Sequence, residues 1–200
     1  MILRPYADRG LLVDLPSRAG RRALLQALDG RADLEVVAGE HSVLVLAPPG
    51  RRATVAEELR ALDLTRPVAA DGAREHTIAV TYDGADLAVV AAVWGCSPEA
   101  VADRHASISW TVEFLGFTPG FGYLVTDQEL PQMPRRDSPR TRIPAGSVAL
   151  AAHYCGIYPQ ATPGGWQLIG HTDATLFDPG ADDPALLHPG DTVRFSPSWP

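Results

Sequence analysis

Four arginines and one aspartate fall between residues 135 and 142, inside a segment that also holds three prolines. The guanidinium group binds a carboxylate or a phosphate through two parallel hydrogen bonds. Flanking prolines stiffen the segment, which lowers the entropy cost of holding the arginines in place. The pattern therefore indicates an anion site or a partner surface, with a solvated charged face as the alternative.

Two other segments combine glycine with large aromatic rings, GFTPGFGYL at 116–124 and TPGGW at 162–166. Glycine permits positive φ angles and lets a ligand approach the backbone closely. A Pro-Gly-Gly-Trp turn also exposes backbone N–H groups beside a large ring, which suits a small polar ligand. A tight turn with an aromatic plug and a hairpin with a core tryptophan are the structural alternatives.

Hydroxyl, imidazole and carboxyl groups add further candidates. Ser147 could be a hydroxyl ligand, but no G-x-S-x-G elbow marks it as a nucleophile. His105 ends an expected helix, where the helix dipole favours a cation. Structural roles are the alternative for His105, His153 and His171, whose spacing matches no metal motif. Glu113 lies in an otherwise apolar strand and is either outward-facing or a site carboxylate.

The composition excludes several kinds of chemistry. The 200 residues contain no lysine and no asparagine, so all 17 basic residues are arginines. Without lysine the chain has no Walker-type phosphate loop, Schiff-base lysine or biotinylation site, and without asparagine it has no N-glycosylation site. The formal net charge of -7 argues against nucleic acid as a partner, because a phosphate-binding surface usually needs a basic domain.

The same composition indicates a folded chain in a reducing compartment. Apolar residues make up 46% of the sequence, which is enough for a buried core. Cys96 and Cys155 are too few for a disulfide framework and fit no zinc signature, so we expect packed free thiols and no metal. The N-terminus lacks a signal-peptide pattern, and no apolar run approaches the ~18–20 residues that span a bilayer. We therefore expect a soluble, cytoplasmic protein.

The first seventy residues alternate strand and helix signals. Apolar runs indicate three strands, at 11–15, 34–37 and 42–46. Apolar residues at helical spacing indicate two helices, at 19–28 and 54–64. Ser17 is the expected N-cap of the first helix. This order predicts a small α/β sandwich domain over residues 1–73, which ends in a linker at 65–73.

The second part of the chain begins with a mixture of elements and continues with strands alone. A strand is expected at 75–82 and helices at 86–94 and 97–105. Short strands separated by turns follow, at 110–117, 123–125, 147–152, 156–158, 166–170 and 192–195. Such spacing predicts a closed or nearly closed β-barrel over residues 74–200. The chain as a whole is expected to be α+β.

The motifs occur in an order that resembles a known family. They are Tyr82-Asp83-Gly84 with Asp86-Leu87, the helix ending in His105, GFTPGFGYL at 116–124, the arginine and proline run from 134 to 150, GIYP at 156–159, TPGGWQLIGHT at 162–172 and GDTVRF at 190–195. Together they resemble the KipI/PxpB family, also called allophanate hydrolase subunit 1 or carboxyltransferase subdomain A/B proteins. The resemblance covers residues 75–197 with specific motifs and the first seventy residues by length and element order.

The resemblance implies a cyclophilin-like fold for the barrel and a multi-subunit function. Family members work with a KipA/PxpC-type subunit (allophanate hydrolase subunit 2) and, with a LamB/YcsF-type subunit, form a 5-oxoprolinase that opens 5-oxoproline to glutamate at the expense of ATP. An unstrained lactam is a stable amide, so phosphorylation of its oxygen would create the leaving group. Because this chain has no recognisable phosphate loop, ATP is expected to lie partly or wholly on another subunit. The alternatives are a regulatory module that inhibits a histidine kinase and a biotin-dependent carboxyltransferase-like subunit for urea or allophanate.

The resemblance also implies roles for residues of the motifs. His105, Arg135, Arg140 and Arg142 are the catalytic candidates, with the arginines gripping a carboxylate or a phosphorylated intermediate. The substrate-binding candidates are Phe117, Pro119, Gly120, Phe121, Ser147, His153, Tyr158, Gly164, Gly165 and Trp166. Among them the rings of Phe117, Phe121 and Trp166 would wall the pocket, and the amides of Gly164 and Gly165 would stabilise an oxyanion. The chain departs from the family pattern at Tyr154-Cys155 and at His171.

Overall fold

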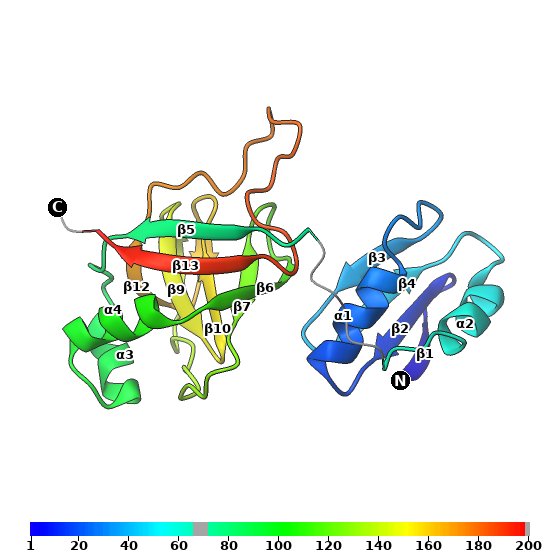
Figure 1. The fold of residues 1–200 in the computed structure, drawn as a ribbon, viewed down its shortest axis with the longest axis horizontal. Helices are drawn as coiled ribbons and strands as arrows, with labels where there is room; N and C mark the ends of the chain where they lie inside the picture. Colours follow the sequence, from blue (N-terminus) through cyan, green and yellow to red (C-terminus); the bar gives the residue numbers. More distant parts are fainter. Residues whose placement is uncertain (66–71, 199–200) are drawn as a thin grey trace. The chain divides into compact units, whose positions relative to one another are not determined.

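A computed structural model describes residues 1–65 and 72–198 and divides the chain into two compact units (Figure 1). The units are Met1–Asp71 and Gly72–Pro200, so the division falls two residues before the boundary expected from the sequence. A linker was expected at 65–73, and most of it, residues 66–71, lies outside the described residues.

The first unit is a four-stranded antiparallel sheet with two helices. The strands are β1 (Ile2–Tyr6), β2 (Gly10–Asp14), β3 (Glu35–Ala38) and β4 (Ser42–Leu46), in the spatial order β1-β2-β4-β3. The helices are α1 (Arg18–Ala27), which packs against β4, and α2 (Arg52–Arg60), which packs against β2. Strand β1 was not expected, because it is an edge strand whose residues are nearly all exposed and carry no apolar alternation.

The predicted start of the first helix is confirmed. The Ser17 hydroxyl accepts a hydrogen bond from the Gly20 N–H at 3.1 Å, which satisfies one of the free donors of the first turn. Leu24 of α1 and Leu59 of α2 are buried on the strand residues Val13 and Val45. The second helix ends four residues earlier than expected.

The second unit is built on a seven-stranded sheet in the order β12-β9-β10-β7-β6-β13-β5. The strands are β5 (Glu75–Val80), β6 (Trp110–Leu115), β7 (Gly122–Val125), β9 (Ser147–Ala151), β10 (Tyr154–Ile157), β12 (Gln167–His171) and β13 (Thr192–Pro197). Just past the end of β5, Thr81 forms a bridge with His171 through two backbone hydrogen bonds of 2.9 Å. This bridge joins the two edge strands, so the sheet closes into the predicted barrel.

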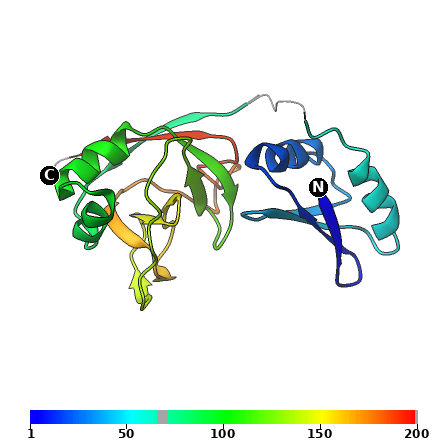
Figure 2. The same ribbon diagram turned by 90° about the horizontal axis from the view of Figure 1, so that it is seen from below.

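Two helices, α3 (Leu87–Trp94) and α4 (Pro98–Ser107), lie side by side against the barrel (Figures 1 and 2). Helix α3 packs on β12 and α4 on β13. Gly95 ends α3 at a φ of 67°, and the Ser97 hydroxyl then caps α4, which has Pro98 in its first turn. The barrel core includes the fully buried side chains of Trp110 and Leu124.

Two further strands were not expected from the sequence. Strand β8 (Arg140–Ile143) and strand β11 (Thr162–Gly164) pair with each other in a separate two-stranded sheet. Arginine, proline and glycine give neither segment a strand signature. Their pairing sets Gly164 opposite Arg140, so the arginine segment and the Pro-Gly-Gly-Trp turn come together.

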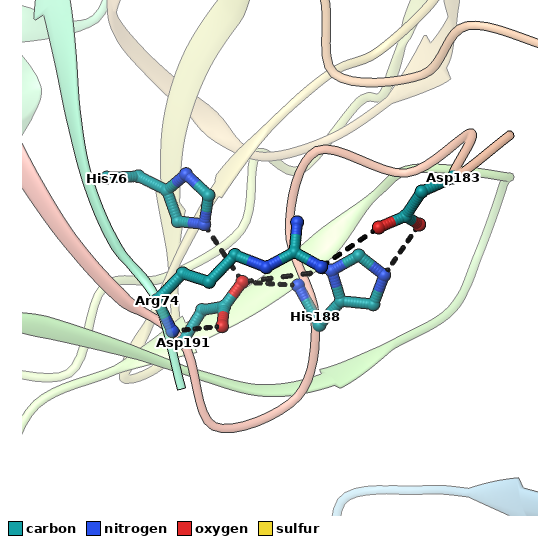
Figure 3. Close-up of polar contacts among 5 residues, drawn as sticks. All are labelled: Arg74, His76, Asp183, His188 and Asp191. Atoms are coloured by element: carbon teal, nitrogen blue, oxygen red, sulfur yellow. Dashed lines mark hydrogen bonds and ion pairs between the residues drawn. The ribbon is translucent and has the colours of Figure 1, made fainter. Parts of the chain in front are cut away.

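A cluster of charged side chains fixes the long segment that leads into β13 (Figure 3). The carboxylate of Asp191, only 3% exposed, accepts hydrogen bonds from the Arg74 N–H, His76 Nε2 and the His188 N–H, each 2.9 Å long. Asp183 binds the Arg74 guanidinium and His188 Nε2, both at 3.0 Å. Asp191 therefore connects the start of β5 with the loop that precedes β13. This contact gives the aspartate of the GDTVRF motif a structural role.

Candidate functional site

The arginine segment is held by a single carboxylate from the turn before α3. Asp86 Oδ1 accepts hydrogen bonds from Arg136 Nη1 at 3.0 Å and from Arg140 Nη2 at 2.9 Å. Asp86 Oδ2 accepts a third from the Leu168 N–H of β12 at 2.8 Å. The Asp86 side chain is 4% exposed, whereas those of Arg140 and Arg136 are 22% and 35% exposed. The three contacts join three segments that are distant in the sequence.

Asp86 is ionised at neutral pH. Burial by itself raises the pKa of this carboxyl, but the hydrogen bonds from Arg140 and the Leu168 N–H, and the charges of Arg140 and Arg136, outweigh that effect. The pKa of Asp86 therefore lies below its ordinary value. Because two guanidinium groups share one carboxylate, the cluster keeps one excess positive charge.

An aromatic cluster lies in the same unit, with Phe121 at its centre. The Phe121 ring contacts those of Phe117, Tyr123, Tyr158 and Trp166, at centroid distances of 5.5, 5.1, 5.2 and 5.4 Å. All four contacts are edge-to-face, the arrangement that the ring quadrupoles favour. Phe121, Tyr158 and Trp166 are buried.

Phe117 differs from the other rings because it is 60% exposed. Its φ angle is 67°, a left-handed conformation that a phenylalanine rarely adopts. Nearby, Gly120 also has a positive φ, and a β-carbon there would lie 2.6 Å from Cβ of Phe177. The 116–122 turn therefore presents one ring to solvent in a strained conformation, with Pro119 exposed beside it.

Tyr158 connects the rings with the arginines. Burial raises the pKa of the Tyr158 phenol to about 12, the nearby Tyr123 adds to the effect, and the charges of Arg135 and Arg140 partly oppose it. The phenol is therefore protonated at neutral pH and able to donate a hydrogen bond. Its oxygen lies so close to Gly164 that a β-carbon at position 164 would come within 2.6 Å of it.

The structure thus brings most of the motif residues into one region. Around Tyr158 it gathers Phe117, Phe121, Gly164, Trp166, Arg135 and Arg140. Gly165 lies beside the arginine segment, because its carbonyl accepts a 2.8 Å hydrogen bond from the Arg136 N–H. The guanidinium donors and the Tyr158 phenol suit an anion or an oxygen-rich ligand, and the exposed Phe117 ring suits a flat apolar surface.

His105 lies apart from this region, in the barrel core. Its side chain is fully buried in the barrel core, with Nδ1 2.8 Å from the Tyr82 hydroxyl and Nε2 3.3 Å from Cys155 Sγ. Burial lowers the pKa of His105 to about 3, so the ring is neutral. Its ring packs on Phe195 and Trp110.

The structure places three other candidates as follows. Ser147 is buried at the start of β9, and its backbone carbonyl accepts a hydrogen bond from the Tyr158 N–H. His153 packs against Tyr154 beside Trp94 and Trp110. Arg142 lies on β8 with an exposed side chain.

Residues outside the set of predicted site residues complete the cluster. Asp86 and Arg136 supply the ion pairs, and Gln167, 4% exposed, donates from Nε2 to the Pro134 carbonyl at 2.9 Å. Arg136 stood in the same arginine run as the selected residues. No local spacing could have paired Asp86 with arginines 50 and 54 residues further on.

Other features of the second unit lie apart from this cluster. A hollow of about 190 Å³ at the barrel closure is lined by residues that include Thr77, Thr81, His171, Asp173 and Ser198. Within residues 1–65 and 72–198, no three His, Cys, Asp or Glu side chains are grouped to hold a metal ion. No helix of this part of the chain is long and apolar enough to cross a bilayer.

The fold and the motifs define a carboxyltransferase-type domain. The family model described as "Carboxyltransferase domain, subdomain C and D" matches residues 1–187, and the chain belongs to this family. The subdomains are therefore C and D, where the resemblance gave A and B. The alignment covers both units of the chain.

Curated relatives agree with the predicted family. The chain is 44% identical over 189 residues to the B subunit of 5-oxoprolinase from Escherichia coli O157:H7, covering 93% of this chain and 81% of the relative. It is 48% identical over 112 residues to the B subunit of 5-oxoprolinase from Bacillus subtilis (strain 168), covering 56% of this chain and 47% of that one. The KipI/PxpB assignment is confirmed.

Solved structures confirm the fold class. TTHA0988 matches with a TM-score of 0.80 at 35% identity over 96% of this chain, which spans 40% of that protein's length. PH0987 of Pyrococcus horikoshii matches with a TM-score of 0.59 at 31% identity, over 98% of this chain and 97% of its own. The K. lactis urea amidolyase matches with a TM-score of 0.76 at 20% identity, over 98% of this chain and 15% of its own, a likeness of fold alone.

Proposed function

We propose that this chain is the PxpB-type component of a multi-subunit 5-oxoprolinase, which opens 5-oxoproline to glutamate. The observation that carries the proposal is the 44% identity to a 5-oxoprolinase component of the same type across both units of the chain. The gathering of the motif residues around Tyr158 supports it, because it provides one region for a small anionic substrate.

In this reaction the subunits have different roles, and ATP is bound at least partly outside this chain. Hydrolysis of an unstrained lactam needs activation, and ATP would supply it by phosphorylating the lactam oxygen. This chain contains no lysine and no phosphate loop, so the nucleotide lies partly or wholly on another subunit. The partners are a KipA/PxpC-type subunit and a LamB/YcsF-type subunit, and the chain is inactive without them.

Residues of the cluster would act on the substrate by binding and orientation. A guanidinium group neutralises a carboxylate or a developing oxyanion, and the protonated Tyr158 phenol can donate to an oxygen. The exposed Phe117 ring would close the region from water when the subunits assemble.

The test is reconstitution of the complex from separately purified subunits. Glutamate formation from 5-oxoproline is measured with ATP, with ATP omitted and with each subunit omitted in turn. The proposal expects activity only in the complete mixture with ATP.

Unchanged activity in the mixture that lacks this chain would overturn the proposal. So would the absence of activity from a soluble complex that contains this chain in stoichiometric amount. As a matched control, Arg194→Gln removes an exposed arginine that forms a surface ion pair with Glu75, and it should leave the rate unchanged.

A further inference from the structure

We propose that Arg136 and Arg140 form a carboxylate-binding subsite in which Asp86 is a positioning residue. The ligand named for it, the carboxylate of 5-oxoproline, rests on the proposed function. The subsite differs from the expectation drawn from the sequence, which selected Arg135 and Arg142 beside Arg140.

Asp86 is held from two sides, by the arginines and by the backbone of β12. One of its oxygens accepts from both guanidinium groups, and the other accepts from the Leu168 N–H of β12. The backbone hydrogen bond fixes the carboxylate, and the carboxylate in turn fixes both arginines. Preorganised arginines lose less conformational entropy when they bind a ligand than free ones do.

The arginine pair also carries an unneutralised positive charge. Asp86 neutralises only one of the two guanidinium groups, so the pair keeps one excess positive charge on a protein whose net charge is -7. The two arginine side chains remain partly exposed, so an anion can approach them from solvent. The donor fork of arginine matches a carboxylate or a phosphate in geometry, and the proposed substrate carries a carboxylate.

Three polar side-chain atoms of this cluster have no hydrogen-bond partner among the described residues. Arg136 Nε and Arg140 Nη1 are buried and have no hydrogen-bond acceptor among the described residues, and Gln167 Oε1 has no donor there. Asp86 therefore does not saturate the arginines. The carboxylate of 5-oxoproline would supply a further acceptor to the partly exposed guanidinium groups.

The test compares two lactams that differ only in the carboxylate. Titrations of the assembled complex with 5-oxoproline and with 2-pyrrolidinone, followed by calorimetry, separate recognition of the carboxylate from recognition of the ring. Arg140→Gln and Arg136→Gln should each weaken 5-oxoproline binding about 10- to 100-fold and leave 2-pyrrolidinone binding unchanged. The control Arg194→Gln should change neither.

Asp86→Asn tests whether Asp86 positions the two arginines, because the two possible roles of Asp86 change the affinity for 5-oxoproline in opposite directions. If Asp86 only neutralises charge, its removal leaves a more positive site and 5-oxoproline binds more tightly. If Asp86 positions the arginines, binding weakens in spite of the added charge, and Asp86→Glu restores part of it. Tighter binding in Asp86→Asn would overturn the positioning role.

A variant that keeps charge guards against loss of folding. Arg140→Lys retains the positive charge but loses the fork, so 5-oxoproline binding should fall while the unfolding midpoint stays within a few degrees of wild type. Equal binding of 5-oxoproline by Arg140→Lys and wild type would overturn the subsite.

Failure of the subsite and failure of the proposed function are distinguishable. A complex that hydrolyses 5-oxoproline, with the same preference over 2-pyrrolidinone in wild type and Arg140→Gln, keeps the function and overturns the subsite. A complex that does not hydrolyse 5-oxoproline, but binds glutarate in a manner lost in Arg140→Gln, overturns the function and keeps the subsite.

Discussion

Gly164 lies against the phenol of Tyr158, with space for a hydrogen atom but none for a methyl group. A β-carbon at position 164 would stand 2.6 Å from the Tyr158 oxygen and 2.7 Å from Cδ1 of Ile143. The glycine of one motif is thus required by the tyrosine of another.

Gly164→Ala should therefore displace Tyr158 and lower the free energy of unfolding by about 1–3 kcal/mol, as overpacking in a core does. Gly165→Ala is the matched comparison, because a β-carbon there meets nothing closer than 3.8 Å. Urea unfolding of both variants checks the difference. Equal stability of the two variants would contradict the close packing at position 164.

Phe117→Gly should lower the activity of the reconstituted complex and leave the stability of the chain nearly unchanged. Glycine relieves the left-handed strain at position 117, and this gain offsets its greater flexibility in the unfolded chain. Stability should stay within about 1 kcal/mol of wild type, while the reconstituted complex loses activity. A drop in stability well beyond this range would show that the exposed ring serves folding instead.

His105 should make the fold less stable as the pH falls. The folded protein keeps the ring neutral because burial lowers its pKa to about 3, whereas the unfolded chain takes up a proton near pH 6.5. The unfolded state then binds more protons, so stability declines from about pH 6.5 toward pH 3. Urea titrations at pH 7 and pH 4.5 should show a smaller decline for His105→Gln than for wild type, and equal declines would refute this.

Asp191→Ala should cost about 2–4 kcal/mol, because it leaves the Arg74 N–H, the His188 N–H and His76 without their buried acceptor. Asp183→Ala removes a carboxylate that is 48% exposed and should cost much less than Asp191→Ala. Thermal unfolding of the two variants measures the contrast, and the reverse order would mean that the loop is held elsewhere.

Local signals in the sequence were sufficient for most of the elements. The Ser17 and Ser97 caps, the apolar run of α3 and the alternating strands of the barrel depend on neighbouring residues, and the structure has them within a few positions of the expected bounds. Strands β8 and β11 were not predicted, because their sequences have no strand pattern and they become strands only by pairing with each other.

The candidate site was likewise predictable from the sequence only in part. The family motifs selected Arg140, Tyr158, Gly164 and Trp166 as site candidates, and the structure brings these residues close together. They could not choose between Arg136 and its neighbours, nor could they show that His105 is buried and neutral.

The sequence by itself determined the family, the secondary structure of the barrel and the residue types available for chemistry, because these depend on local pattern and composition. Only the tertiary structure decided which charges meet. Asp86 binds arginines that are 50 and 54 residues away because closure of the barrel brings the turn before α3 to β12 and the β8–β11 pair. Contacts across such separations arise from packing of the whole unit, and no local spacing encodes them.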